Sequence, residues 1–260
     1  MTDTGHALPR RFPSVVHALL DAARHAPNAP ALICGDECLS CRDYTACVAG
    51  LARELANRCP PGGRIAVLMA NSIDIAIPSF AVQAAGLQLV PLNPAYTPHE
   101  LAPILANAEP AGLIHDADCP QTIISLATEQ GVQHRWSVGP EWRLTRWRND
   151  PLELGRFPLP SPEALSTLQY TGGTTGRSKG VNLTHESVSI NVSQREALLP
   201  TRMGDERILA VTPLFHVYAV AMGLYLAVFC RGTLVILPRY RPERVFEAIE
   251  RHQITLFSAG

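Results

Sequence analysis

The feature that most constrains the fold is the alternation of short, continuously apolar segments with longer segments whose apolar residues recur at helical spacing. Strand-like runs cover 64–69, 87–92 and 111–115, and helical patterns cover 40–58 and 72–85. A strand buried on both faces is apolar throughout, and parallel strands are usually joined through a helix. The pattern therefore predicts an α/β fold of parallel-rich sheets covered by helices.

Two of the expected helices begin with a strong capping signal. Ser40 is followed three positions later by Asp43, and Thr97 is followed by Pro98 and Glu100. In such a pair the hydroxyl accepts from a free backbone N–H, and the carboxylate accepts from the N–H of the capping residue. We therefore expect helices to begin directly after Ser40 and Thr97.

A proline-rich segment, 139–163, interrupts the alternation and is interpreted as a linker-like surface excursion. It divides the chain into a first α/β lobe, 1–138, and a second lobe, 164–260. The last residues, 255–260, are typical of a buried strand, so the second lobe is expected to be incomplete at its C-terminus. In the second lobe we expect strands near 166–170, 207–212, 232–237 and 254–258, and helices near 185–198, 214–228 and 242–252.

Charge and cysteine usage exclude several classes of protein. Lys and Arg total 22 and Asp and Glu total 23, so charge gives no reason to expect a nucleic-acid partner. No apolar run is long enough to span a membrane, although peripheral membrane contact and oligomeric state stay open. The N-terminus lacks the apolar stretch of a secretory signal, and seven scattered cysteines suit a reduced, cytoplasmic setting.

The segment 171–180, TGGTTGRSKG, carries the chemistry. Its glycines let the backbone approach a ligand closely, and successive N–H groups in such a loop form an anion-binding concavity. Threonine hydroxyls add donors and Lys179 adds a mobile cation. Because the loop follows an apolar strand, 165–170, it lies where α/β proteins usually bind ligands. A triphosphate is the simplest ligand that fits.

A P-loop is the nearest rival, but its motif requires a Gly-Lys pair five residues after the first glycine. Counting from Gly172 or Gly173 gives Arg177 or Ser178, so that spacing fails. A flexible surface loop with an incidental lysine is the other alternative. The density of glycine, threonine and lysine after a buried strand argues against it.

The residues 168–181, LQYTGGTTGRSKGV, closely resemble the phosphate-binding signature of the adenylate-forming superfamily, with Ser178 where proline is usual. Three further segments, 39–52, 85–94 and 213–219, resemble other motifs of the superfamily and follow one another in the same order as those motifs do. Within the superfamily, the chain most resembles the fatty-acyl-CoA synthetases. The resemblance implies the N-terminal domain of such an enzyme. The implied reaction is ATP-dependent activation of a carboxylic acid, with a fatty acid favoured, to an acyl-adenylate and then an acyl-CoA.

The resemblance also implies roles for individual residues. Lys179, Thr175 and His216 are the expected catalytic residues, and His216 would lie near the acyl carboxylate and the thiol. Thr174 would approach Mg²⁺ through ATP, and coenzyme A would be the co-substrate. In this family the Mg²⁺-binding glutamate, the ribose-binding aspartate, the hinge and the C-terminal lysine come later in the chain. None of them is found before Gly260, so this piece alone is expected to be inactive. The residues expected to bind ATP are Thr171, Gly172, Gly173, Thr174, Thr175, Gly176 and Lys179.

Other interpretations remain open. An aryl- or amino-acid substrate is the nearest alternative, and a degenerate, non-catalytic nucleotide-binding module is another. Cys34, Cys38 and Cys41 have the spacing of an iron–sulfur site, but they lie on an expected strand–turn–strand. Tryptophans and arginines between 136 and 148 suit stacking on single-stranded nucleic acid, although a surface excursion explains them more simply. The apolar stretch 220–229 is interpreted as core helix rather than as the wall of an acyl pocket.

Overall fold

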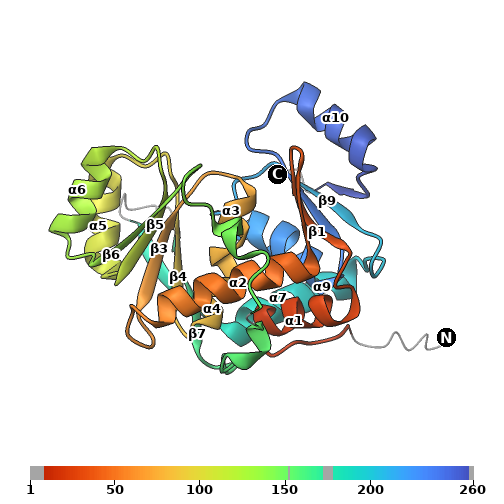
Figure 1. Cartoon of the computed structure of the whole chain (residues 1–260), viewed down its shortest axis with the longest axis horizontal. Coiled ribbons are helices and arrows are strands. Elements are labelled where there is room, and N and C mark those ends of the chain that lie inside the picture. The colour runs from red at the N-terminus through yellow and green to blue at the C-terminus, as the bar shows by residue number, and fades with distance from the viewer. Residues whose placement is uncertain (1–8, 152, 172–177, 258–260) are drawn as a thin grey trace.

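The computed structural model describes residues 9–151, 153–171 and 178–257. Two sheets, each mostly parallel, confirm the predicted α/β class. Figure 1 shows the sheets on either side of a group of helices that includes α1, α2, α4 and α9. A single large apolar core joins these helices to both sheets, with Leu32, Ile65 and Ile208 all fully buried. The helices therefore cover one face of each sheet at once.

The first sheet has six strands in the order β6-β5-β3-β4-β7-β8. Every neighbouring pair is parallel except β7 with β8, which form an antiparallel hairpin. Its strands are β3 (Arg64–Leu68), β4 (Gln88–Leu92), β5 (Gly112–Asp116), β6 (His134–Val138), β7 (Leu165–Thr171) and β8 (Lys179–Thr184).

The second sheet has five strands in the order β11-β9-β10-β1-β2, and only β1 with β2 is antiparallel. Both sheets therefore take strands from each side of segment 139–163, so the two lobes expected from the sequence share both sheets. The strands are β1 (Pro30–Cys34), β2 (Glu37–Ser40), β9 (Arg207–Ala210), β10 (Thr233–Ile236) and β11 (Leu256–Phe257).

The predicted helix starts are confirmed, since Ser40 with Asp43 and Thr97 with Glu100 each form a complete capping box. Two predicted helices are broken. The pattern over 72–85 divides at Pro78, whose ring removes one helical N–H, and the pattern over 214–228 starts only at Val217. The helices are α1 (Val15–His25), α2 (Cys41–Ala56), α3 (Ile73–Ala76), α4 (Pro78–Ala84), α5 (Pro98–Ala108), α6 (Gln121–Glu129), α7 (His185–Leu198), α8 (Val217–Ala219), α9 (Leu226–Phe229) and α10 (Pro242–His252), with 3₁₀ turns η1 (Leu144–Trp147) and η2 (Leu154–Arg156) and a π-helix, η3 (Val220–Tyr225).

The interpretation of 139–163 as a surface linker is corrected by its packing. Leu144 and Leu154 are fully buried in the main core. Asp74, buried at the start of α3, accepts from the Leu144 N–H at 2.7 Å and from the Arg143 side chain. An extended surface linker could not satisfy a buried carboxylate in this way.

The tryptophans of this segment contact other residues of the protein. The Arg146 guanidinium lies 5.7 Å from the centre of the Trp142 ring and 5.8 Å from that of Trp147, a cation–π arrangement. Trp147 packs so closely on α2 that only glycine fits at position 50 beneath it. Trp147 and Gly50 therefore dock the segment on the helix.

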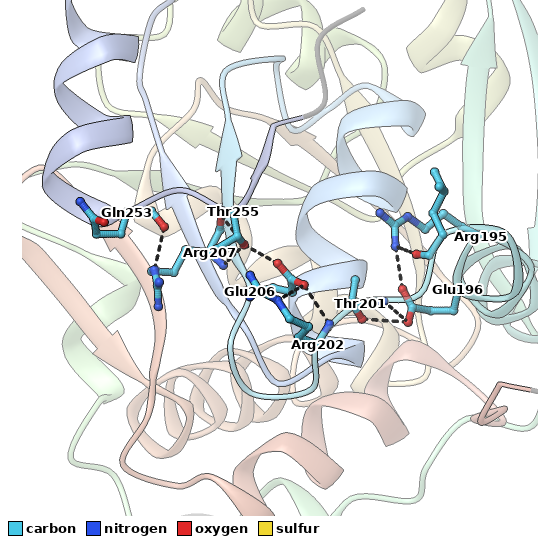
Figure 2. A network of polar contacts seen from close by, with 9 residues as sticks. Arg195, Glu196, Thr201, Arg202, Glu206, Arg207, Gln253 and Thr255 are labelled. Atoms are coloured by element: carbon cyan, nitrogen blue, oxygen red, sulfur yellow. Dashed lines mark hydrogen bonds and ion pairs between the residues drawn. The ribbon is translucent and has the colours of Figure 1, made fainter.

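Polar contacts connect the segment between α7 and β9 with the residues that precede β11 (Figure 2). Glu206, just before β9, accepts from the hydroxyl of Thr255 and from the backbone N–H of Arg202. The Arg207 side chain donates to the backbone oxygen of Gln253 at 2.9 Å. These contacts hold the end of α10 against the sheet. In the described part of the chain no helix is long and apolar enough to cross a membrane.

Candidate functional site

The loop that the sequence singles out closes the β7–β8 hairpin. Thr171 ends β7, Lys179 begins β8, and the two residues are register partners across the antiparallel pair. Within that loop, Gly172, Gly173, Thr174, Thr175 and Gly176 lie outside the described residues. The hairpin strand β7 runs parallel to β4, so its carboxyl end lies at the same sheet edge as those of β3, β4 and β5. This is the edge at which open α/β sheets bind ligands.

Lys179 is the only lysine in the 260 residues, whose other positively charged side chains, histidine aside, are all arginines. It is exposed, and its side chain makes no ion pair with any residue that the structure describes. An ammonium group is a compact point charge that pairs with phosphate from many directions. Among the described residues of the hairpin, Lys179 therefore presents a free cation beside the glycine-rich loop.

His216 is placed at the N-cap of the short helix α8, where it is exposed. The backbone N–H of Tyr218 donates to its Nδ1 at 3.3 Å. A backbone N–H can only donate, so Nδ1 carries no proton and the neutral ring has its proton on Nε2. His216 therefore presents an N–H donor. The predicted functional role and the alternative of a capping histidine are compatible in this geometry.

A cavity of about 230 Å³ lies next to His216. Leu214 and Val217, on either side of that histidine, form part of its wall. Thr167 and Gln169, which share a strand face with Thr171, form another part. The cavity thus adjoins both the β7–β8 hairpin, through β7, and the segment that carries the histidine. Its lining is mainly apolar.

The π-helix η3 forms the far side of the cavity, through Val220, Ala221 and Tyr225. Isolated π turns often occur at functional sites. The expectation that 220–229 is core helix is correct for Leu224 and Leu226, which are fully buried, but η3 also lines the cavity. The sequence pattern could not distinguish a core helix from a cavity wall. An α-helix and a π-helix differ by about one residue in a turn, which the spacing of apolar residues does not reveal.

A buried polar chain supports this end of the cavity. The side chain of Gln83, in α4, donates to the Tyr225 hydroxyl at 2.9 Å and accepts from the Ser166 hydroxyl at 2.9 Å. All three residues are less than 5 % exposed. Burial raises the pKa of Tyr225 far above its usual value, so the hydroxyl stays protonated. Its own proton has no acceptor among the described residues.

Asn71 is a further residue that the sequence analysis missed. It follows β3, is 7 % exposed, and accepts from the Leu214 N–H at 2.7 Å. Its amide donates to the backbone oxygens of Thr212 and Leu237 at 3.2 and 3.3 Å. The available signal was a polar residue just beyond the carboxyl end of a buried strand, where ligand-binding loops begin.

The three cysteines considered for an iron–sulfur site have different surroundings. Cys38 is exposed, Cys34 is half-buried, and Cys41 is buried at the start of α2. Burial raises the pKa of Cys41 to about 11, which disfavours the thiolate that would ligate iron. Across the described ranges, no group of three His, Cys, Asp or Glu side chains could hold a metal ion.

Comparison with known proteins identifies the family of this chain. The model of a family described as AMP-binding enzyme matches residues 19–259. The chain belongs to the AMP-binding enzyme family. This membership confirms the resemblance seen in the phosphate loop and the predicted fold.

Relatives of this AMP-binding chain act on different acids. It is 27 % identical over 288 residues to a long-chain-fatty-acid–CoA ligase of Bacillus subtilis, a match covering 98 % of this chain and 51 % of the relative. It is 32 % identical over 236 residues to a feruloyl-CoA synthase of Amycolatopsis, covering 90 % and 46 %. The chain spans about half the length of the curated relatives it matches.

A solved structure resembles the AMP-binding chain over nearly its whole length. It is o-succinylbenzoate CoA synthetase from Bacillus subtilis, in complex with its acyl-adenylate intermediate. The TM-score is 0.80 at 25 % identity, and the match covers 96 % of this chain and 62 % of that one. The likeness therefore extends well beyond the phosphate loop.

Proposed function

We propose that the protein containing this chain activates an apolar carboxylic acid with ATP and transfers it to coenzyme A, releasing AMP and pyrophosphate. The observation that carries the proposal is the arrangement along β7. One strand lines the apolar cavity with Thr167 and Gln169 and then ends at Thr171, opposite the unpaired cation of Lys179. An acid in that cavity has its carboxylate near the phosphate loop.

The residues present fit a nucleotide triphosphate. A free ammonium group and the threonine at the start of a glycine-rich loop match the charge and the hydrogen-bonding needs of phosphate oxygens. In the proposed first step a carboxylate oxygen attacks the α-phosphorus, and the bond to the β-phosphate breaks to release pyrophosphate. Lys179 would stabilise the charge on that leaving group. Thr171, Thr174, Thr175 and the loop glycines would hold the triphosphate, with Mg²⁺ near Thr174.

In the proposed second step the thiol of coenzyme A loses its proton to solvent, the thiolate sulfur attacks the acyl carbon, and AMP leaves with the bonding electron pair. In the sequence His216 lies between Leu214 and Val217, which line the cavity, and it carries its proton on Nε2, so in this proposal it donates to the acyl oxygen as negative charge develops there. The chain's own contribution is therefore to orient the acid and to neutralise charge, rather than to form covalent bonds.

A fatty acid is the favoured substrate, because the cavity is mainly apolar and several relatives are named long-chain-fatty-acid–CoA ligases. An aryl acid is the second candidate, favoured by one observation. Tyr225 lines the cavity, and its hydroxyl, which accepts from Gln83, has no acceptor for its own proton among the described residues, so a substrate ring hydroxyl that reached it would accept that proton. Feruloyl-CoA synthase is the relative that supports this candidate.

The nucleotide part of the proposal can be tested on the 260 residues themselves. Because Lys179 is the only lysine, amine-selective acetylation read by mass spectrometry reports on that side chain and on the N-terminal amine alone. We expect MgATP to slow acetylation of Lys179 several-fold while the N-terminal amine, the internal control, reacts unchanged. Equal rates at Lys179 with and without MgATP would contradict the assignment.

The acid is identified by carboxylate-dependent ATP–pyrophosphate exchange in the natural-length polypeptide, with fatty, aryl and amino acids in parallel. We expect exchange with a fatty acid, lowered at least about 100-fold by Lys179→Ala together with Thr175→Ala. Arg156→Ala, at an exposed arginine outside the β7–β8 hairpin, is the matched control. No exchange with any acid would favour the degenerate-module alternative.

A further inference from the structure

The end of the β7–β8 hairpin that carries Thr171 and Lys179 extends beyond the strand pairing of the first sheet. In the described part of the chain β7 pairs with β4 through one register pair, Leu89 with Thr167, whereas β3 and β4 pair through five. β8 is an edge strand, so β7 is its only neighbour among the described strands. Contacts other than pairing with β4 must therefore hold this end of the hairpin in place.

Tyr170, one residue before Thr171, ties this end of the hairpin to α5. Its hydroxyl donates to the side-chain oxygen of Asn107 at 2.6 Å, and the backbone oxygen of Ile104 lies 3.4 Å from the same hydroxyl. Both acceptors belong to α5, which covers the face of the sheet opposite α2 and α4 (Figure 1). On that face Leu168 of β7 shares a buried apolar cluster with residues of α5. The tyrosine therefore connects the hairpin to a helix that the core already holds.

The ring of Tyr170 also covers Gly180, its register partner on β8. A Cβ at position 180 would lie 3.3 Å from two ring carbons of Tyr170 and 3.0 Å from a methyl group of Leu168. Because Gly180 has no side chain, the ring lies against the backbone of β8, as aromatic residues do when they stabilise a glycine across a strand pair. The position of Gly180, and of Lys179 beside it, therefore depends on where α5 holds Tyr170.

A second route joins β8 to the same end of α5. The side-chain oxygen of Asn182 accepts from Gln88 at 2.8 Å, and Gln88 accepts from the Arg64 guanidinium at 3.0 Å. Arg64 in turn donates to the backbone oxygen of Ala108, the last residue of α5, at 2.8 Å. Gln88 is buried, so these two partners satisfy its amide. Each strand of the hairpin is thus tied to α5, one before the glycine-rich loop and one after it.

We propose that the last turn of α5 positions Lys179 for the triphosphate, with Asn107 and Asn182 as positioning residues that touch no substrate. The inference rests on the proposed function, in which ATP binds at the β7–β8 hairpin, and adds to it residues outside the glycine-rich loop. Lys179 makes no ion pair with any described residue, so its place is set by the backbone that carries it. A hairpin that is held before ATP arrives loses less conformational entropy on binding, which raises the affinity.

The first test is Asn107→Ala, read by acetylation of Lys179 in the 260-residue chain over a range of MgATP concentrations. We expect the Kd of MgATP to rise about 3- to 10-fold, because Tyr170 has lost its acceptor on the Asn107 side chain. The urea midpoint should stay unchanged, since Asn107 is exposed and alanine is the better helix former. Asn57→Ala, at an exposed asparagine after α2, is the matched control and should change neither quantity.

Combined variants test the route by which Asn107 acts. In a chain that carries Tyr170→Phe, Asn107→Ala should raise the Kd no further, because the donor of that hydrogen bond is already gone. Adding Asn182→Ala to Asn107→Ala should raise the Kd by a further factor of about 3 to 10, because it removes the second route. Tyr240→Phe, at an exposed tyrosine outside the hairpin, is the control for loss of a hydroxyl. An unchanged Kd in Asn107→Ala, or additive effects of Asn107→Ala and Tyr170→Phe, would overturn the proposal.

Pyrophosphate exchange in the natural-length polypeptide separates positioning from general damage. Asn107→Ala should raise the KM for MgATP by the same factor and leave the KM for the carboxylic acid unchanged. The reason is that Thr167 and Gln169, which line the cavity, point to the face of β7 opposite Tyr170. A parallel rise in both constants would show a merely structural effect and would overturn the positioning role.

Hydrogen exchange without any ligand separates this inference from the proposed function. The backbone amides of β8 should exchange several-fold faster in the variant that carries both Asn107→Ala and Asn182→Ala, while those of β5 stay unchanged. Unchanged exchange in β8 would overturn the restraint by α5, whatever the hairpin binds. If β8 responds as expected but MgATP fails to protect Lys179 in the unmodified chain, the ATP assignment is overturned and the restraint stands.

Discussion

The side-chain oxygen of Asn71 accepts a hydrogen bond of 2.7 Å from the backbone N–H of Leu214, which lies 143 positions further along the chain. The amide of the same side chain donates to the backbone oxygens of Thr212 and Leu237. One buried side chain therefore joins the loops that follow β3, β9 and β10. It connects the two sheets beside the segment that carries His216.

Replacing Asn71 with alanine should lower the free energy of unfolding by about 2–4 kcal/mol, because it leaves buried backbone groups without partners. Urea unfolding of the 260-residue chain measures the change. Asn57→Ala, at an exposed position after α2, is the matched control and should stay within about 0.5 kcal/mol of the unmodified chain. Equal effects of the two substitutions would show that Asn71 does not join the loops.

Gly50→Ala should destabilise the protein even though alanine is the better helix former. A Cβ at position 50 would lie 2.6 Å from the Cβ of Trp147, so the segment 139–163 could not keep its place on α2. We expect a loss of about 1–3 kcal/mol in urea unfolding. Gly155→Ala is the control, because a Cβ there meets nothing within 4 Å.

The double variant Gly50→Ala with Trp147→Gly tests the same contact from both sides. If the Trp147 side chain is the obstacle, the two losses should be clearly less than additive, since removing both its indole and its Cβ makes room for the new methyl group. Strict additivity would mean that Gly50 is required for another reason.

His185 should make the protein sensitive to acid. It is 2 % exposed at the first position of α7, and its Nδ1 has no partner among the described residues. Burial, with a smaller contribution from His17, lowers the pKa of His185 to about 4. The unfolded chain, with an ordinary histidine pKa, then binds a proton that the folded chain does not between about pH 6.5 and 4.

The unfolding free energy should therefore fall as the pH is lowered through that window, by as much as about 3 kcal/mol from this residue. Urea unfolding at pH 7 and pH 4.5 measures the fall, and His185→Phe should reduce it. His99→Phe, at an exposed position, should leave it unchanged. The same fall in His185→Phe as in the unmodified chain would assign the acid sensitivity to other groups.

The sequence predicted those features of the fold that depend on contacts between residues close together in the chain. The capping boxes at Ser40 and Thr97 were correct because each involves contacts within four residues. The strands β3, β4 and β5 were found because burial on both faces makes each run apolar. The antiparallel strand β8 was not predicted, since its exposed, mixed composition gives no such signal.

By itself the sequence determined the α/β class, the family and the position of the glycine-rich loop, because glycine, threonine and lysine at fixed spacing are a local property. Only the tertiary structure decided that 139–163 docks on α2, that η3 borders a cavity, and that Asn71 joins three loops. Those results depend on contacts between residues far apart in the chain. Such a contact stabilises the protein only when the folded sheets bring the two residues together. The spacing of residues within a single segment therefore cannot predict it.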